Sequence, residues 1–190
     1  MRVRDEEKQA ALFEATIKVV NQIGFASSSV SKIAKEAGIS PATLYIYHKN
    51  KEDLLVSTYM QIKRDLAQAL LRNLDTTRPI RDILETVWLN GFGYISKHRS
   101  HFDFAEQFGN SPFADLVNKT ELNRMYVPLI DVFTRGIEQK ILKNVNSELL
   151  KIFMIHPLMV LSNKRVCADF EAKPKSIEEA FDMAWDAIKL

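Results

Sequence analysis

Residues 30–55 of the chain read VSKIAKEAGISPATLYIYHKNKEDLL, and this stretch decides how the amino-terminal part folds. Its apolar residues recur with helical spacing from Val30 until Gly38 interrupts them. Ser40 and Pro41 then supply an N-cap and a proline for the first helical position, where the missing N–H costs nothing. The stretch predicts two short helices joined by a tight glycine turn, residues 29–37 and residues 41–47. These are the dimensions of a helix-turn-helix.

The rest of the chain has helical periodicity almost throughout and no convincing alternation of apolar and polar residues. Further helices are expected over residues 12–23, 51–74, 79–97, 112–143, 149–166 and 176–190. Ser176 and Glu179 form a capping box at the start of the last of these. The prediction is an all-α fold of about nine helices. It has a three-helix amino-terminal domain over residues 1–50 and a helical bundle over residues 51–190, whose first helix connects the two.

The composition excludes several classes of protein. The 190 residues are 46% hydrophobic and 26% charged, and the net charge is +2, as in a globular protein rather than a disordered chain or a polycation. A single cysteine, Cys167, excludes an intramolecular disulfide framework and a cysteine-based zinc site. The polar amino terminus is unlike a signal peptide, and no window has the ~18 apolar residues of a membrane span. A cytoplasmic protein is therefore expected.

The second helix of the motif is too short to bury much surface. Leu44 packs inward, and the residues left to point outward are Thr43, Tyr45, Tyr47, His48 and Lys49. Hydroxyls, aromatic rings and a lysine in this arrangement suit the phosphates and base edges of DNA, and they also occur on plain solvated surface. Residues 1–64 hold ten lysines and arginines against seven acids, or +3, whereas residues 65–190 hold sixteen against seventeen, or −1. The positive excess lies in the part that contains the motif.

The quoted stretch resembles the signature of the TetR family of bacterial transcriptional regulators. The matching pattern is Ile-Ala-x-x-Ala-Gly-Ile-Ser-x-x-Thr-Leu-Tyr-x-Tyr over residues 33–47, followed by Asn-Lys-Glu-x-Leu-Leu over residues 50–55. The match covers residues 8–56. The resemblance implies a DNA-binding regulator whose larger helical domain binds a ligand and forms the dimer.

The resemblance also implies a set of DNA-binding residues. Ser29 and Ser31 open the first helix of the motif, where the family contacts phosphate. The positions that face the major groove are Pro41, Ala42, Thr43 and Tyr45. Tyr47 and Lys51 match positions that grip phosphate.

His48 departs from the family pattern, which usually has phenylalanine at this position. The sequence leaves open whether His48 faces DNA or anchors the core. Pro41 and Ala42 offer no hydrogen bond to a base, so direct readout rests on Thr43 and Tyr45, with His48 or Ser31 as further candidates. Apolar contacts to thymine methyl groups add to it.

DNA-binding proteins with such short recognition helices contact few base pairs and usually act as twofold dimers on palindromic sites. The apolar segment 149–166 and the amphipathic segment 176–190 are candidates for a dimer interface or for ordinary core. Their position matches the last two helices, about residues 147–167 and 176–190, with which the family forms its dimer. This match favours a homodimer interface.

Aromatic residues concentrate between Trp88 and Phe108. Rings at helical spacing are commonly core, but Pro128 and Pro157 fall inside helical patterns and are expected to kink their helices and hold neighbours apart. Similar regulators hold a small organic effector in such a cavity. The predicted effector-binding residues are Tyr59, Trp88, Phe92, Phe104, Phe108, Met125 and Phe133. This lining suits a hydrophobic or cationic aromatic compound.

His98 and His101, with Asp103 and Glu106 nearby, have the residue types of a metal site. The lysine and arginine beside them favour a solvated turn instead. The sequence contains no phosphate-binding glycine loop, H-E-x-x-H pair or nucleophile elbow. No metal, cofactor or enzymatic activity is predicted.

These features together predict a homodimeric repressor that leaves its palindromic operator when an effector binds the domain over residues 51–190. The alternative is a helix-turn-helix regulator controlled by a protein partner, without a small-molecule effector.

Overall fold

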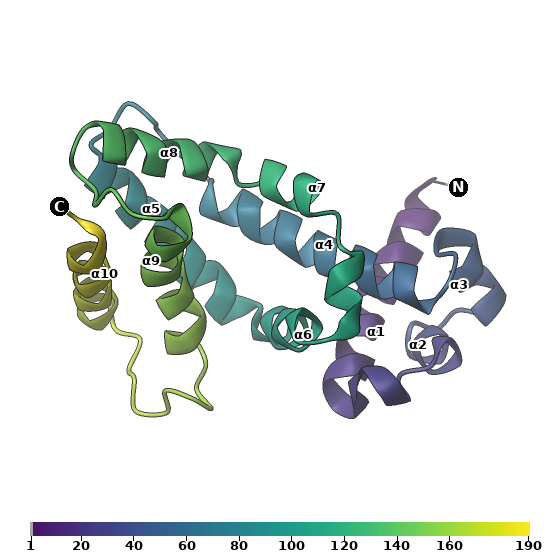
Figure 1. The fold of residues 1–190 in the computed structure, drawn as a ribbon. Coiled ribbons are helices and arrows are strands. Elements are labelled where there is room, and N and C mark those ends of the chain that lie inside the picture. The colour runs from purple at the N-terminus through teal and green to yellow at the C-terminus, as the bar shows by residue number, and fades with distance from the viewer. Residues whose placement is uncertain (1) are drawn as a thin grey trace. The chain divides into compact units, whose positions relative to one another are not determined.

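Figure 1 shows the chain as a computed structural model, which describes residues 2–190, with side chains from Asp5 onward. Met1, the first residue of the predicted 1–50 domain, lies outside the described residues. The elements are α1 (Arg2–Ser27), α2 (Val30–Glu36), α3 (Pro41–Tyr47), α4 (Lys51–Leu70), α5 (Ile80–Lys97), α6 (Arg99–Gly109), the 3-10 helix η1 (Pro112–Leu116), α7 (Lys119–Arg124), α8 (Val127–Glu138), α9 (Ser147–Leu161) and α10 (Pro174–Ile188). Between residues 2 and 190 there is no strand, and the all-α prediction is confirmed.

The chain folds as two compact units. Unit 1 holds the residues up to Lys63 together with Ser100–Lys119, and unit 2 holds Arg64–Arg99 together with Thr120–Leu190. Unit 1 therefore combines the first three helices and the start of α4 with nearly all of α6. The boundary expected between residues 50 and 51 separates a DNA-binding part from an effector-binding part, and it stays a prediction. The two packed units are divided elsewhere, between Lys63 and Arg64 within α4.

Unit 1 has a hydrophobic cluster that α1, α2, α3 and α4 build together. Its buried members are Leu12, Ala15, Val19, Ile33, Ala34, Leu44 and Leu54. Only Leu44 comes from α3, which is too short to be stable without such contacts. The helix-turn-helix is thus held against α1 and α4 by apolar burial.

A second cluster in unit 1 joins α1 and α4 to α6. Its buried members are Ile17, Val20, Leu55, Ile62, Phe104, Ala105 and Phe108. The ring of Phe25 lies edge-on to Phe104, with 5.5 Å between the ring centroids. Phe25 directly follows Gly24, where φ of 73° interrupts α1. This is the position after the helix that the sequence predicts over residues 12–23.

The core of unit 2 is centred on α5. The apolar face of this helix is buried throughout: Ile83, Leu84, Val87, Trp88 and Phe92. Trp88 lies edge-on to Phe181 of α10, with 5.8 Å between centroids. Leu150, Met154 and Leu158 complete this core from α9. No helix of residues 2–190 has the length and apolarity needed to span a membrane.

Several expected helices have different boundaries in the structure. The helix expected over residues 112–143 is divided into η1, α7 and α8. Pro128 lies in the first turn of α8, where it starts a helix instead of kinking one, because it has no N–H for a bond to the preceding turn. Pro157, by contrast, lies inside α9 as predicted.

The last two helices also differ from their predicted ranges. α9 ends at Leu161 because Asn163 forms a turn, in which its side-chain oxygen accepts from the N–H of Arg165 at 3.0 Å. The capping box predicted at Ser176 is wrong. α10 begins at Pro174, whose fixed φ suits the first turn, and its N-cap residue makes no side-chain capping bond.

Two glycines provide a matched test of the packing in unit 2. A Cβ on Gly136 would lie 2.7 Å from Cγ and 2.6 Å from Cδ1 of Leu142, whereas a Cβ on Gly93 would meet nothing within 4 Å. We expect Gly136→Ala to lower the free energy of unfolding by about 1–3 kcal/mol through overpacking. Gly93→Ala should raise it by about 0.5–1 kcal/mol through helix propensity. Urea titrations followed by circular dichroism measure both, and equal effects would contradict the packing.

Candidate functional site

Backbone hydrogen bonds close the turn between α2 and α3. The N–H of Ile39 donates to the carbonyl of Ala34 at 3.0 Å, and that of Gly38 donates to the carbonyl of Lys35 at 3.2 Å. This pair of bonds is a Schellman motif, which requires a left-handed residue after the helix. Gly38 supplies it with φ of 67°. The predicted glycine turn is confirmed, and it sets the direction in which the chain enters α3.

Ser40 is the N-cap of α3, as predicted. Its Oγ accepts from the N–H of Thr43 at 3.0 Å and lies 2.9 Å from the Thr43 hydroxyl. Thr43 is half-buried. Its hydroxyl, which the sequence assigns to base contact, is hydrogen-bonded to the hydroxyl of the Ser40 cap.

The outward face of α3 consists mainly of apolar groups. Its exposed residues are Pro41, Ala42, Tyr45 and Ile46. Successive residues of a helix are about 100° apart, so Ile46, two residues after the buried Leu44, points away from the core. Three of the four residues are among those predicted. Ile46 is not among the predicted residues, although its offset of two positions from Leu44 is a signal that the sequence contains.

Tyr47 turns toward α1 instead. It is half-buried, and its hydroxyl donates to Oδ1 of Asp5 at 3.0 Å. Burial, this hydrogen bond and the charge of Asp5 raise the pKa of the Tyr47 phenol above its ordinary value of 10.0. The phenol therefore stays protonated at neutral pH and links α3 to α1.

His48 lies against α4. Its Nδ1 is 3.3 Å from Oγ of Ser57 and 3.3 Å from Oδ2 of Asp53, and its side chain is 17% exposed. The same Asp53 oxygen accepts from the N–H of Lys49 at 3.2 Å. His48 therefore contacts α4 at the turn that ends α3, and its contact with DNA stays a prediction.

The start of α2 presents two exposed serines. Ser29 is the N-cap, and its Oγ accepts from the N–H of Lys32 at 3.3 Å. Ser31 is exposed in the first turn of α2. The Nζ of Lys32 donates to the carbonyl of Ser27 at 3.1 Å, which keeps this ammonium close to the end of α1.

Lysines lie on the segments before and after α3. Lys35 in α2 and Lys49 after α3 are exposed. Lys51, the first residue of α4, is half-buried, and its Nζ donates to the carbonyl of Phe25. A lysine ammonium has three donors, so this bond fixes Lys51 in place and leaves further donors for an anion.

The seven predicted effector-binding residues are divided between the units. Tyr59, Phe104 and Phe108 belong to the second cluster of unit 1. Tyr59 stacks on Phe108 with 4.4 Å between centroids, and Nζ of Lys63 lies 5.3 Å from the Tyr59 centroid. Burial lowers the pKa of the Lys63 ammonium below its ordinary value of 10.5.

The other four predicted residues belong to unit 2. Trp88, Phe92 and Phe133 are buried in its core, and Met125 is half-buried in the turn after α7. The indole N–H of Trp88 is buried and has no hydrogen-bond partner among the residues described. Neither unit by itself assembles all seven residues.

The solvated turn expected around the histidine pair is wrong for His101. This residue lies in α6 and is 7% exposed, with Nε2 3.3 Å from Oε1 of Glu14 and its ring edge-on to Phe13. Contact with α1, distant in the sequence, is what buries it. His98 caps the end of α5 and stacks on Tyr94, with 4.4 Å between centroids. Over residues 2–190 there is no cluster of three or more metal-ligating side chains.

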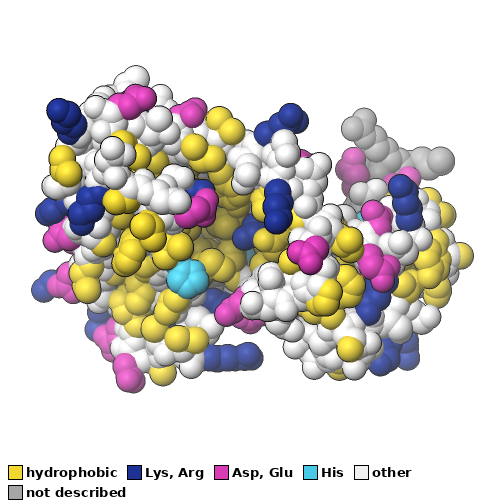
Figure 2. Space-filling view, in the orientation of Figure 1, with side chains coloured by type: hydrophobic (Ala, Val, Ile, Leu, Met, Phe, Trp, Pro, Cys, Tyr) yellow, Lys and Arg dark blue, Asp and Glu magenta, His cyan; other side chains and the backbone are white. Residues whose placement is uncertain are grey.

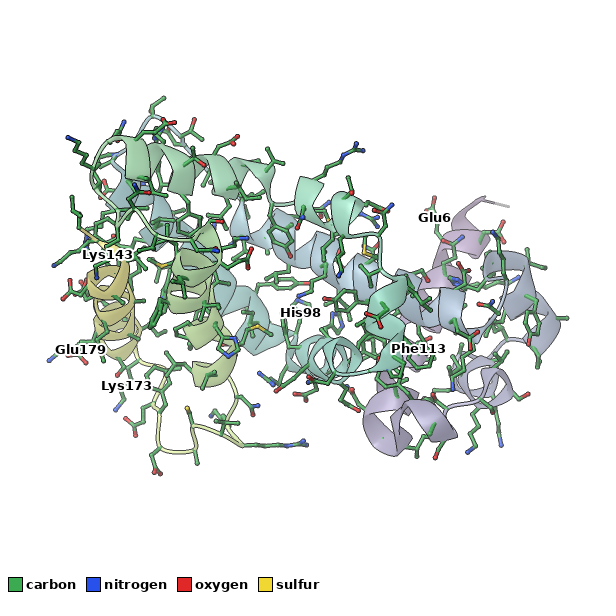
Figure 3. All side chains as sticks on the ribbon, viewed as in Figure 1. Glu6, His98, Phe113, Lys143, Lys173 and Glu179 are labelled. Atoms are coloured by element: carbon green, nitrogen blue, oxygen red, sulfur yellow. The ribbon has the colours of Figure 1, made fainter. Side chains whose placement is uncertain are left out.

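α9 and α10 form an open apolar groove of about 930 Å³. Its lining includes Phe153, Pro157, Val160 and Met183, and Met183 is 76% exposed. Hydrophobic side chains gather over α9 in Figure 2. Charged residues border the same helix pair, and Figure 3 shows Lys173 and Glu179 beside α10.

Family models match both parts of the chain. Residues 12–58 match the model described as bacterial regulatory proteins, tetR family. Residues 79–189 match the model described as tetracyclin repressor-like, C-terminal domain.

Known proteins match over the whole length. A TetR family transcription regulator from Marinobacter aquaeolei VT8 is 34% identical, with a TM-score of 0.90 over 100% of this chain and 99% of that one. An uncharacterized HTH-type transcriptional regulator of Haemophilus influenzae is 23% identical over 100% of both chains. The transcriptional regulator FadR from Bacillus subtilis, solved in complex with stearoyl-CoA, is 20% identical, with a TM-score of 0.73 over 94% of this chain and 97% of that one.

The cap of α3 gives a test of how the site is held. Ser40→Ala removes the acceptor for the Thr43 N–H, and we expect it to lower the free energy of unfolding by about 1 kcal/mol. Ser40→Asp keeps an acceptor and should restore most of this loss. Ser31→Ala, an exposed change one helix earlier, is the control and should leave stability nearly unchanged. Chemical denaturation of the three variants measures the differences, and an undiminished stability of Ser40→Ala would refute the capping role.

Proposed function

The chain belongs to the TetR family of bacterial transcriptional regulators, and we propose that it is a repressor which a small hydrophobic or aromatic effector releases from a palindromic operator. Family membership makes the chain a DNA-binding regulator with a helix-turn-helix. Its relatives are regulators and not enzymes. The observation that carries the proposal is α3, a seven-residue helix that buries Leu44 and presents Pro41, Ala42, Tyr45 and Ile46 to solvent.

We assign the operator contacts to two groups of residues. Pro41, Ala42, Thr43 and Tyr45 face the major groove in this proposal, with the Tyr45 hydroxyl as the exposed polar group of the set. The phosphate contacts come from Ser29, Ser31 and Lys51. Tyr47 joins them in this proposal only when its hydroxyl leaves Asp5, because a phenol has a single proton to donate. His48 contributes indirectly, because its contacts with Asp53 and Ser57 hold the turn between α3 and α4.

The proposed dimer forms through α9 and α10. Regulators of this family bind operator DNA as dimers. The groove between these helices supports the proposal, since Ile152, Phe153 and Met183 are large hydrophobic residues that a single chain leaves exposed. A twofold dimer places its two α3 helices in successive major grooves, about 34–36 Å apart along the DNA.

The effector is proposed to bind the carboxy-terminal part and to favour a conformation that fits the operator less well. Such a ligand shifts the equilibrium only by its differential affinity for the two states. The B. subtilis relative solved with stearoyl-CoA supports an effector with a long apolar group. Tyr59 and Met125 are the two predicted effector residues that are only partly covered, so we propose them as first contacts, each in its own unit.

Release of DNA by stearoyl-CoA tests the effector. The purified protein binds a fluorescent duplex selected from a random-sequence pool, and anisotropy is followed while stearoyl-CoA, stearate or coenzyme A is added. We expect an acyl compound to weaken binding at least tenfold and coenzyme A alone to have no effect. Tyr59→Ala and Met125→Ala show which unit the effector contacts. A complete lack of response to stearoyl-CoA and stearate would count against an acyl effector and favour control by a protein partner.

The phosphate role of Lys51 predicts a particular salt dependence. Lys51→Ala should weaken binding to the selected duplex and to random duplexes by similar factors. It should also reduce the slope of log K against log salt by about 1 per subunit, because one phosphate contact is lost. Lys51→Arg should keep the slope, and Lys175→Ala on the exposed surface of α10 is the control. A changed sequence preference with an unchanged slope would contradict the assignment.

A further inference from the structure

Ile46 is the most solvent-exposed large hydrophobic side chain of the described residues, at 77%. We infer that Ile46 is a specificity-determining residue that contacts the 5-methyl group of a thymine in the major groove. The inference rests on operator binding through α3. It adds a residue outside the predicted set of DNA contacts, together with the chemical group that this residue recognises.

The position of Ile46 on α3 gives the first argument. It lies about 200° around the helix axis from Leu44, the one buried residue of the helix, so it points directly outward. Tyr45 and Ala42 are exposed beside it on the same side. No contact within unit 1 explains an isoleucine here, since neither hydrophobic cluster of this unit includes Ile46.

The chemistry of the exposed face gives the second argument. Pro41, Ala42 and Ile46 offer no side-chain hydrogen bond, and the hydroxyl of Thr43 is already bonded to the Ser40 cap. The thymine methyl is the distinctive apolar group of the major groove, so an apolar face selects for it. A β-branched side chain has few χ1 rotamers in a helix, so the γ2 methyl group of Ile46 is held close to one position.

The charges around α3 give the third argument, because they identify DNA as the occupant. Lys35 and Lys49 are exposed on the segments that precede and follow the helix, and Lys51 begins the next one. No acidic residue occurs within α3 or its caps, between Ser40 and His48. An apolar strip bordered by lysines complements a groove whose floor carries methyl groups and whose rims are phosphates.

A double substitution in protein and DNA tests the contact. The full-length protein and Ile46→Ala each select duplexes from a random-sequence pool, and every thymine of the wild-type half-site is then replaced in turn by deoxyuridine, which removes only the methyl group. Symmetric replacement in both half-sites keeps the palindrome. We expect one position at which deoxyuridine weakens wild-type binding by about fourfold per half-site. At that position the replacement should have no effect on Ile46→Ala, and Ile46→Ala should no longer select thymine there.

Three outcomes would overturn the inference. The first is that the effects of Ile46→Ala and deoxyuridine add at every position. The second is that Ile46→Ala binds as tightly as the wild type. The third is that Ile46→Ala weakens binding to selected and random duplexes equally. Ile23→Ala, at a residue 42% exposed on α1, is the matched control and should leave all affinities unchanged. Thermal unfolding verifies that both variants fold. If the wild-type protein enriches no sequence, operator binding fails together with the inference, whereas enrichment with additive effects refutes the role of Ile46 alone.

Discussion

Leu44 is the only side chain that α3 buries, and the direction of every other residue of that helix depends on this contact. A helix of seven residues has too few internal hydrogen bonds to be stable by itself. The Schellman turn at Gly38, the cap at Ser40 and the burial of Leu44 among residues from α1, α2 and α4 together fix it. With Leu44 directed inward, Tyr45 and Ile46 have to point outward.

Local features were predictable because their causes lie within a few residues. The caps at Ser29 and Ser40, the turn at Gly38 and the apolar face of α5 all follow from short-range spacing. The His48 contacts and the Tyr47–Asp5 hydrogen bond were not predictable, because they join the end of α3 to α4 and to the beginning of α1. Helical periodicity shows which side of a helix is apolar, but it does not identify the side chain opposite.

The difference between short-range spacing and contacts between distant segments also explains why the helix boundaries and the aromatic cluster of the carboxy-terminal part were predicted wrongly. Helical periodicity runs through residues 112–143, but the segment is divided after Leu116 and again before α8, where Pro128 has no N–H to continue the preceding turn. The aromatic residues between Trp88 and Phe108 look like one set in the sequence. The structure divides them, because α6 packs in unit 1 and α5 packs in unit 2. Composition alone cannot make this division.

Phe25 joins two kinds of contact at one residue. Its ring lies against Phe104 and Phe108 of α6, and its carbonyl accepts from the ammonium of Lys51. The same residue therefore packs against the aromatic core through its side chain and holds, through its backbone, a lysine proposed to bind phosphate. A substitution that removes the ring leaves the carbonyl acceptor in place, so the two contacts can be separated by mutation.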